Sequence, residues 1–266
     1  MKRSLRFLSA AVALAGSHVA RAGDLASGDT LRAVYLAGNP AQAMRDPASG
    51  EVRGASFDLA QALARRDGVA LQFRPGGDPS SVIEAVRTGA ADIGFVAYEA
   101  TRLGTVAFSQ PYMLVRQSFL VLEGSPLRSV ADIDRAGQTI GGTRNDSITL
   151  CMQRTFRRAK VVEVPNTPAE LGAALTRRSV DAIGANRQRL TALMRLTQGT
   201  RLLPDDLFSV PQNVVVAQDR PAALATVNAT IDALRASGAM QAAIERGGAV
   251  GVAVAPAGAT AGCPQD

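Results

Sequence analysis

The chain has 266 residues, which is enough for one large domain or two domains of ordinary size. Four of its 29 basic residues and none of its 23 acidic residues lie before residue 23, so the rest of the chain has a net charge of only +2, its arginines are scattered, and we expect no nucleic-acid partner. Because the single histidine is His18, residues 23–266 have no imidazole for a hydrolase triad or a histidine-ligated metal, and we expect neither metal nor cofactor.

The N-terminal segment has the pattern of a secretory signal peptide. A basic start is followed by an apolar run over residues 7–15, and Ala20-Arg21-Ala22 provides the small residues that signal peptidase accepts. The pattern predicts a signal peptide over residues 1–22 that is cut after Ala22, with no cysteine there for a lipid anchor. No later stretch approaches the ~20 apolar residues of a spanning helix. We therefore expect a free periplasmic protein.

The next segment, from Thr30 to Val96, alternates between strand and helix patterns. Apolar residues recur at helical spacing in some stretches and alternate in others. The expected elements are strand 31–35, helix 57–66, strand 69–73, helix 80–88 and strand 92–96. Strands and helices that take turns indicate β-α-β crossovers and a parallel sheet.

A second unit of the same kind follows from Gln138 to Ala185. Its expected elements are strand 139–141, a helix that begins near residues 145–147, strand 161–164, helix 168–177 and strand 181–185. In each unit the last helix leads into the last strand through an aspartate, Asp92 in the first and Asp181 in the second. This shared pattern predicts two equivalent sheet units.

Two short apolar runs, residues 119–122 and 213–217, are expected to be strands that cross between the units. Helices over 222–234 and 239–245 and an irregular tail rich in glycine and alanine are expected to return to the first lobe. The predicted divisions are 1–22 for the signal peptide, 23–118 for the first part of lobe 1, 119–213 for an inserted lobe 2, 214–250 for the return of lobe 1 and 251–266 for the tail. We thus predict an α/β protein whose two lobes hinge around a cleft at the carboxyl ends of their strands.

The chain has two cysteines, Cys151 and Cys263. In an oxidising compartment such a pair commonly forms a disulfide, and this bridge would close a loop of about 110 residues, for which chain entropy gives roughly 4–5 kcal/mol. The alternative is a small buried helix residue at position 151 and a free thiol in the tail. The sequence leaves both possibilities open.

Several short motifs follow one another in a characteristic order and spacing. They are Gly50-Glu51-Val52-Arg53-Gly54 leading to Phe57-Asp58-Leu59-Ala60, Gly89-Ala90-Ala91-Asp92-Ile93, Thr101-Arg102, Phe108-Ser109-Gln110-Pro111-Tyr112, Ser129-Val130-Ala131-Asp132-Ile133, Ser179-Val180-Asp181-Ala182-Ile183 and Leu234-Arg235-Ala236-Ser237-Gly238. Together they make the chain resemble the bacterial extracellular solute-binding proteins of family 3, which serve ABC importers mainly for amino acids and similar small polar molecules. The resemblance implies a periplasmic-binding-protein-like fold of type II, with two lobes joined by two hinge strands.

The resemblance also implies where the ligand binds. In the family, the arginine at the position of Arg102 holds the ligand carboxylate, for which a guanidinium fork is well matched. The nearby strand end and loop, with Ala97, Tyr98 and Glu99, are expected to line the same cleft. The alternative for Arg102 is a surface position in a connecting loop.

This chain departs from the family pattern in the cleft. Amino-acid-binding members carry an aspartate that pairs with the ligand ammonium, whereas this chain has Asn186, which supplies no full charge and makes an ordinary α-amino acid a weaker candidate. Ala97 stands where the family usually has a hydroxyl residue. The turn after the first strand, around Asn39, is also altered, and we expect Tyr35 or Tyr98 to supply an apolar wall instead.

Residues 141–147 are expected to open a helix of the second lobe, where free backbone N–H groups attract anions. Ser147 matches a hydroxyl residue of the family, and Asn145 is expected to reach the cleft beside it. Asp146 either caps the helix with its carboxylate or points into the cleft and recruits a cation. The sequence does not decide between these two roles.

These features predict a monomeric, periplasmic solute-binding component of an ABC importer, not an enzyme. It would hold a small, polar, carboxylate-bearing solute and deliver it to a membrane permease. One alternative is an enzyme similar to the periplasmic cyclohexadienyl dehydratases, with Glu99 and Asp146 as acid and base. Another is a ligand sensor that takes no part in transport.

Overall fold

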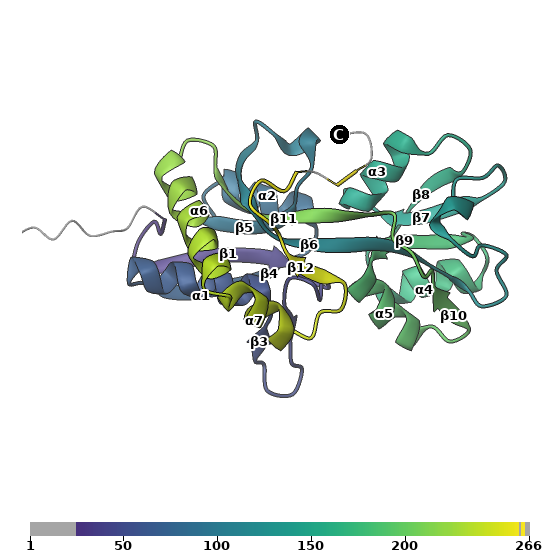
Figure 1. Cartoon of the computed structure of the whole chain (residues 1–266), viewed down its shortest axis with the longest axis horizontal. Coiled ribbons are helices and arrows are strands. Elements are labelled where there is room, and N and C mark those ends of the chain that lie inside the picture. The colour runs from purple at the N-terminus through teal and green to yellow at the C-terminus, as the bar shows by residue number, and fades with distance from the viewer. Residues whose placement is uncertain (1–24, 261, 264–266) are drawn as a thin grey trace, which may run out of the picture.

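The structure is a computed structural model that describes residues 25–260, 262 and 263. The predicted signal peptide and its cleavage site after Ala22 therefore lie outside the described residues. Within these residues, one ten-stranded sheet runs the length of the molecule, with helices on both of its faces (Figure 1). Its main path has the strand order β4-β1-β5-β11-β6-β9-β7-β8, and β10 and β12 pair with β6.

The first lobe is built on three parallel strands. Its elements are β1 (Thr30–Leu36), the short hairpin β2 (Met44–Arg45) and β3 (Val52–Arg53), α1 (Ala55–Asp67), β4 (Ala70–Gly76), α2 (Pro79–Arg87) and β5 (Ile93–Ala97). Asp78 begins α2 by accepting a hydrogen bond from the Ser81 amide at 2.7 Å, and Pro79 suits the first helical position. Gly68 ends α1 in the left-handed conformation at φ 68° that few other residues adopt. The predicted alternation of strands and helices is confirmed.

The second lobe repeats this arrangement. Its elements are β7 (Thr139–Thr143), α3 (Ser147–Thr155), β8 (Lys160–Val164), α4 (Pro168–Thr176), β9 (Ala182–Asn186), α5 (Arg187–Leu196) and β10 (Thr200–Leu202). The strand order β8-β7-β9 mirrors β4-β1-β5, and all of these neighbours are parallel. The amides of Asp92 and Asp181 donate to equivalent carbonyls, those of Arg32 and Thr139. The repeated order confirms the predicted pair of equivalent sheet units.

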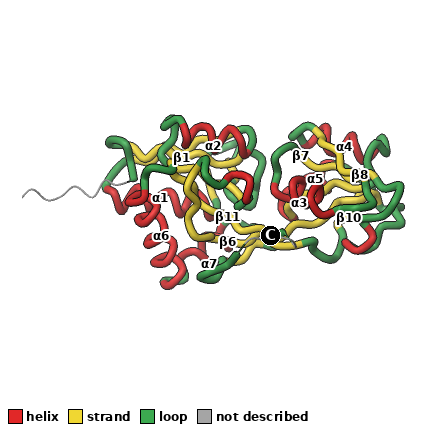
Figure 2. The backbone as a smooth tube through the Cα atoms, turned by 90° about the horizontal axis from the view of Figure 1, so that it is seen from above, coloured by secondary structure: helices red, strands yellow, loops and turns green. Residues whose placement is uncertain are grey.

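Two long antiparallel strands, β6 (Val106–Leu122) and β11 (Phe208–Ala217), pass side by side from one lobe to the other (Figure 2). β6 begins to pair with β9 at Gln117, and β11 begins to pair with β5 at Gln212. Only the ends of these strands were predicted, because Pro111 and Pro211 interrupt the rest of the pattern. The register shifts around Asn213 accommodate this irregular stretch.

Helices cover both faces of the sheet in each lobe. In the first lobe, α1 packs with the returning helices α6 (Pro221–Ala236) and α7 (Ala239–Arg246) on one face, and α2 covers the other. In the second lobe, α3 covers one face, and α4 and α5 cover the other. Residues 25–260 contain no helix that is long and apolar enough to span a membrane. Each lobe therefore has its own hydrophobic core on each face of the sheet.

The C-terminal tail differs from the irregular segment that the sequence predicts. Its residues Val252–Val254 form β12, which pairs with β6, a strand too short to stand out in a stretch rich in glycine and alanine. Beyond β12, Gly262 packs so closely on the Ser209 carbonyl that a Cβ atom would lie 1.8 Å from it. Cys263 forms a disulfide with Cys151 of α3, with the Cα atoms 5.8 Å apart. The tail is thus a third connection between the lobes, beside β6 and β11.

Candidate functional site

A cavity lies between the two lobes, where strands of both units end. Leu36, Ala97, Thr143 and Asn186, the last residues of β1, β5, β7 and β9, all line it. The carboxyl edge of an α/β sheet is where such proteins bind ligands. The volume of this cavity is about 40 Å³. A cavity of this size suits a small solute.

Arg102 reaches this cavity from the short 3-10 helix η1 (Ala100–Arg102) that follows β5, and it is only 8% exposed. Its Nη1 donates to the Ala97 carbonyl at 2.8 Å, and its Nη2 donates to the Asn145 carbonyl of the opposite lobe at 2.5 Å. Burial lowers the pKa of Arg102, and the nearby charges of Glu99 and Asp146 act in the opposite direction. Among the described residues, no carboxylate lies within 4.0 Å of this guanidinium. A buried cation whose bonds go to neutral carbonyls is well suited to bind an anion.

Residues 145–147 approach Arg102 from the second lobe. Asn145 has a left-handed backbone with φ 57°, which asparagine tolerates, and its side chain donates to Ser80 Oγ of the first lobe at 2.9 Å. Asp146 stands at the N-cap of α3, yet its carboxylate makes no capping hydrogen bond. Instead it accepts from Thr143 Oγ1 at 3.3 Å and lines the cavity together with Ser147. Of the two roles that the sequence left open, the structure thus has the cleft-facing one.

Asn186 and Asn39 meet across the cleft. Asn186 caps α5, because its Oδ1 accepts from the Arg189 amide at 2.8 Å, and its Nδ2 donates to Asn39 Oδ1 of the first lobe at 3.0 Å. An aspartate carboxylate at position 186 would keep the cap but have no proton to donate to Asn39. The departure from the family pattern therefore creates a contact between the lobes as well as removing a charge.

Four residues expected at the cavity are not among its lining residues: Tyr35, Tyr98, Glu99 and Asn145, whose side chain bonds to Ser80 instead. Tyr35 is buried in the core and stacks on Phe73 at a ring distance of 4.5 Å, because alternate residues of β1 point to opposite faces and Leu36 faces the cleft. The ring of Tyr98 packs against Phe108 at 5.4 Å, outside the cavity lining. The expected aromatic wall is therefore absent from the described lining.

Glu99 is likewise not among the lining residues. It is 3% exposed, and its Oε1 accepts from Arg154 Nη1 of the second lobe at 2.6 Å. Its carboxylate thus serves an ion pair between the lobes. Expected at the cavity and found there are Asn39, Ala97, Arg102, Asp146, Ser147 and Asn186.

Arg189 is a cleft residue that the sequence analysis did not predict. It lies in the first turn of α5 and lines the cavity with a side chain that is 15% exposed. Its Nη1 donates to Thr143 Oγ1 at 3.4 Å and lies 3.8 Å from Asp146 Oδ2, and its Nη2 donates to Asn166 Oδ1. Burial lowers the pKa of Arg189, and the charge of Asp146 raises it. The side chains of a helix lean toward its N-terminus, so an arginine three residues after Asn186 is expected to reach the cleft. The sequence therefore contained a signal for this residue.

Gln117 and Gln212 line the cavity where the crossing strands pass from one lobe to the other. Gln212 Oε1 accepts from Gln42 Nε2 at 3.1 Å. Gln117 is 2% exposed and donates to the Val115 carbonyl at 3.1 Å, while its Oε1 has no hydrogen-bond partner among the described residues. A buried acceptor without a partner is costly unless a ligand or water satisfies it.

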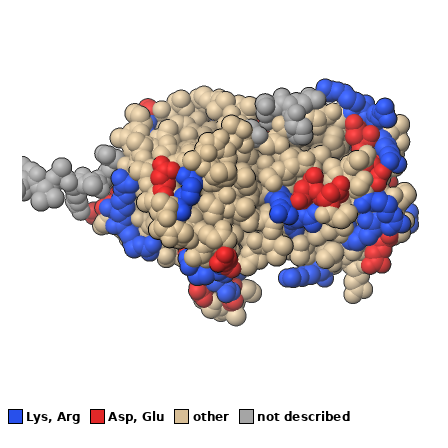
Figure 3. Space-filling view, in the orientation of Figure 1, with Lys and Arg blue, Asp and Glu red and all other residues tan. Residues whose placement is uncertain are grey.

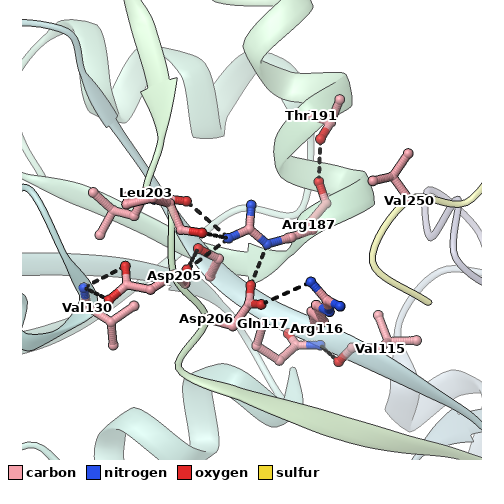
Figure 4. A network of polar contacts seen from close by, with 12 residues as sticks. Val115, Arg116, Gln117, Val130, Arg187, Thr191, Leu203, Asp205, Asp206 and Val250 are labelled. Atoms are coloured by element: carbon pink, nitrogen blue, oxygen red, sulfur yellow. Dashed lines mark hydrogen bonds and ion pairs between the residues drawn. The ribbon is translucent and has the colours of Figure 1, made fainter. Parts of the chain in front are cut away.

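A network of polar contacts holds the loop between β10 and β11 beside these strands (Figure 4). Arg187, the first residue of α5, donates to the carbonyls of Leu203, Pro204 and Asp205 at 3.1, 2.8 and 2.9 Å. It also pairs with Asp206, whose other oxygen lies 3.7 Å from Arg116. The network ties the start of α5, where the cleft residues Asn186 and Arg189 lie, to the loop between β10 and β11.

The lobes touch through polar side chains around the cavity. Besides the contacts of Arg102, Asn145, Asn186 and Glu99, Asn166 donates to the Gly77 carbonyl at 3.3 Å and Gln188 donates to the Val250 carbonyl. The described residues contain no cluster of histidine, cysteine, aspartate and glutamate that could hold a metal ion. The site is therefore a closed polar cavity with two arginines, one from each lobe.

Two similar α/β lobes, a pair of crossing strands and a cavity at four strand ends define a two-lobed solute-binding protein of the type II periplasmic-binding fold. The model of the family described as bacterial extracellular solute-binding proteins, family 3, matches residues 31–246. The chain belongs to this family, as its motifs predicted.

Individual relatives agree with this assignment. The chain is 24% identical over 203 residues to the ABC transporter glutamine-binding protein GlnH of Bacillus subtilis, which covers 73% of this chain and 72% of that relative. The solved structure of the amino acid ABC transporter substrate-binding protein AbpA of Streptococcus pneumoniae, bound to L-arginine, is similar with a TM-score of 0.70 and 20% identity, covering 82% of this chain and 94% of the other. The ancestral amino-acid-binding protein AncCDT-1, a precursor of cyclohexadienyl dehydratase, has a TM-score of 0.69 and 23% identity over 82% and 94% of the two chains. The predicted fold class is confirmed.

Proposed function

We propose that residues 23–266 form a monomeric periplasmic protein, released by cleavage after Ala22, that carries a carboxylate-bearing solute to the permease of an ABC importer. The family and its relatives are substrate-binding proteins of such transporters. The observation that carries the ligand assignment is Arg102, a buried guanidinium at the interlobe cavity that has no carboxylate partner among the described residues. A solute carboxylate supplies the missing counter-charge.

The contacts between the lobes couple binding to closure. Arg102 of the first lobe bonds to Asn145 of the second, and Asn186 of the second lobe bonds to Asn39 of the first. These bonds require the lobes to meet, so a solute that favours the closed form shifts the population toward it. The Glu99–Arg154 ion pair acts in the same direction. Closure in turn presents one fixed surface to the permease.

The class of solute follows from the cavity and the relatives together. Relatives described as binding glutamine or L-arginine favour an amino-acid-like or organic-acid solute. Asn186 lacks the charge with which family members hold an ammonium group, so the carboxylate end of the solute is the better-supported anchor. On the face shown in Figure 3, basic and acidic side chains lie next to one another rather than in patches of one sign, which supports a role without nucleic acid.

An enzymatic role is less well supported. A dehydratase-like mechanism would need two carboxylates that face the reacting molecule, as Glu99 and Asp146 were considered to do. Glu99 is instead bonded to Arg154 outside the cavity lining, which leaves Asp146 as the carboxylate among the lining residues. We therefore propose binding without turnover, and purified protein should leave prephenate and arogenate unchanged.

Calorimetric titration of residues 23–266 with amino acids, keto acids, dicarboxylates and amines tests the proposal. The best carboxylate ligand should bind ~100-fold more weakly to Arg102→Ala, because the variant loses charge-assisted hydrogen bonds in a buried site. Arg177→Ala, at an exposed position of the second lobe, is the matched control and should bind normally. Full carboxylate affinity in Arg102→Ala would refute the anchor.

A further inference from the structure

We infer that Arg189 is a second anion-binding residue, so that the cleft takes a small solute with two carboxylates, one held by Arg102 and the other by Arg189. The inference rests on the proposed function, because it places the solute in the same cleft. It goes further by naming the class of solute and a residue that selects it.

The two arginines occupy related positions in the duplicated fold. Arg102 follows β5 and Arg189 follows β9, which are the third strands of the two equivalent units. They approach the same short segment from opposite lobes, because Arg102 donates to the Asn145 carbonyl and Arg189 lies beside Asp146. A short solute in the cavity can therefore meet one guanidinium at each end.

Arg189 has donors to spare for such a solute. Its two hydrogen bonds go to neutral acceptors, Thr143 Oγ1 and Asn166 Oδ1, of the five N–H donors that a guanidinium offers. The carboxylate of Asp146 stands at 3.8 Å, too far for a hydrogen bond to Arg189 Nη1. With a side chain only 15% exposed, its charge is largely removed from water. Asp146 is thus an ion-pair partner of Arg189 but not a hydrogen-bond partner, and a solute carboxylate would accept hydrogen bonds from the donors that remain.

The charges of the cavity lining favour an anion. The charged residues among the lining residues are Arg102, Arg189 and Asp146, which together give a net charge of +1. Asn186 adds no negative charge to this balance. A solute with two carboxylates and one ammonium group, such as an acidic amino acid, has a net charge of −1 and balances this charge, whereas a solute with a cationic side chain would add to the positive charge.

The remaining acceptors distinguish two kinds of dicarboxylate. Gln117 Oε1 is buried without a hydrogen-bond partner in the described part of the chain, and Asp146 accepts a single long hydrogen bond, from Thr143. Both could accept from an ammonium or a hydroxyl group placed between the two carboxylates. Acidic amino acids and hydroxy dicarboxylates carry such a donor, and unsubstituted dicarboxylates do not. The small cavity favours the four-carbon members, L-aspartate, L-malate and succinate.

Calorimetric titration with these three solutes, with butyrate as a monocarboxylate and with L-glutamine and L-arginine tests the inference. We expect a dicarboxylate to bind most tightly, and Arg189→Gln to weaken its binding ~10- to 100-fold while butyrate binding stays within about twofold. Arg195→Gln, at an exposed position of the same helix α5, is the control and should behave as the wild type. Arg189→Lys keeps the charge and should retain part of the affinity, which separates lost binding from misfolding.

The possible results distinguish this inference from the proposed function. If butyrate binds through Arg102 but the dicarboxylates bind no more tightly, or if Arg189→Gln leaves their affinity unchanged, the second anion site is refuted and the carrier role stands. If no carboxylate binds at all, the proposed function fails as well. Tighter binding of L-glutamine or L-arginine than of every dicarboxylate would also overturn the inference. Stronger binding of L-aspartate or L-malate than of succinate, abolished by Gln117→Met, would assign the donor to Gln117.

Discussion

The aspartate that leads into the last strand is buried in the first lobe and exposed in the second. The side chain of Asp92 is 0% exposed and accepts from Arg32 and from Ser27, whereas Asp181 is exposed and accepts from the Thr139 amide at 2.7 Å. Both aspartates join the last strand to the first strand of their unit. Equivalent positions of the two units thus carry the same backbone geometry with different electrostatic roles.

The cleft shows a similar difference between the lobes. The first lobe contributes Arg102, whose bonds go to two backbone carbonyls, and the second contributes Arg189, whose bonds go to polar side chains beside Asp146. The Ala97 carbonyl is fixed in strand β5, and the Asn145 carbonyl is a backbone group that any residue there would supply, whereas side-chain partners vary with sequence. We infer that the first lobe supplies the constant carboxylate anchor and the second lobe selects among solutes.

The disulfide should have the largest effect on stability, because it ties the second lobe to the tail of the first. It joins residues separated by 112 positions in the sequence, and a loop of this size is worth about 4–5 kcal/mol in chain entropy. The double variant Cys151→Ser, Cys263→Ser should lose about that much free energy of unfolding in urea titrations. Equal unfolding midpoints of oxidised and reduced wild-type protein would contradict the prediction.

The second-largest effect on stability is expected from the loss of the Asp92 contacts. This effect should distinguish the first lobe from the second. Asp92→Asn removes a buried carboxylate that Arg32 and Ser27 need, so we expect a loss of about 2 kcal/mol. The matched variant Asp181→Asn changes an exposed side chain and should lose less than about 1 kcal/mol. Similar losses in both variants, measured by chemical denaturation, would show that the aspartates have the same role.

The same contacts predict a pH dependence. Burial raises the pKa of Asp92, but hydrogen bonds from Arg32 and Ser27 outweigh it, so the folded-state pKa lies below its ordinary value. This contribution to stability is therefore present above the ordinary aspartate pKa of about 4 and is lost as the pH falls through the folded-state value. Compared with the wild type, Asp92→Asn should lose less stability in acid-unfolding experiments below about pH 4. Parallel acid-unfolding curves would rule out this contribution.

The Glu99–Arg154 ion pair should affect closure more modestly. Glu99→Gln replaces a buried carboxylate that bonds across the lobes with an amide, so closure should become less favourable. We expect ligand affinity to fall roughly threefold to tenfold, while the melting temperature of the ligand-free protein changes little. A variant with unchanged affinity in calorimetry would show that this pair does not contribute to closure.

Asn186→Asp should have the smallest effect, and on specificity rather than stability. The carboxylate keeps the α5 cap but cannot donate to Asn39, and it adds the negative charge that family members use for an ammonium group. We expect the affinity for L-aspartate relative to succinate to rise a few-fold. An unchanged ratio in competition titrations would mean that position 186 does not face the solute.

Much of this architecture could be predicted because helix and strand periodicities are local. The alternating elements, the two equivalent units and the fold class follow from apolar spacing and from family motifs. The crossing strands were predicted only in part, since Pro111 and Pro211 lie within them, and β12 consists of three residues in a tail rich in glycine and alanine. Their pairing is set by strands distant in the sequence, which local patterns do not contain.

The cleft was predictable where the backbone fixes a side chain and less so elsewhere. Arg102, Asn186 and Ser147 stand at strand or helix ends and reach the cavity as expected. Tyr35 does not, because a shift of one position along β1 turns a side chain to the opposite face of the sheet. Asp146 had two local options, and its carboxylate faces the cavity beside Arg189 rather than capping α3.

Small-angle X-ray scattering tests most directly whether the lobes close over a carboxylate held by Arg102. The radius of gyration of residues 23–266 should fall when the tightest-binding carboxylate is added, and it should stay constant for Arg102→Ala at the same concentration. Calorimetry at that concentration must show that the wild type is saturated. A wild-type protein that binds the solute without becoming more compact, or an Arg102→Ala variant that compacts equally, would contradict the account.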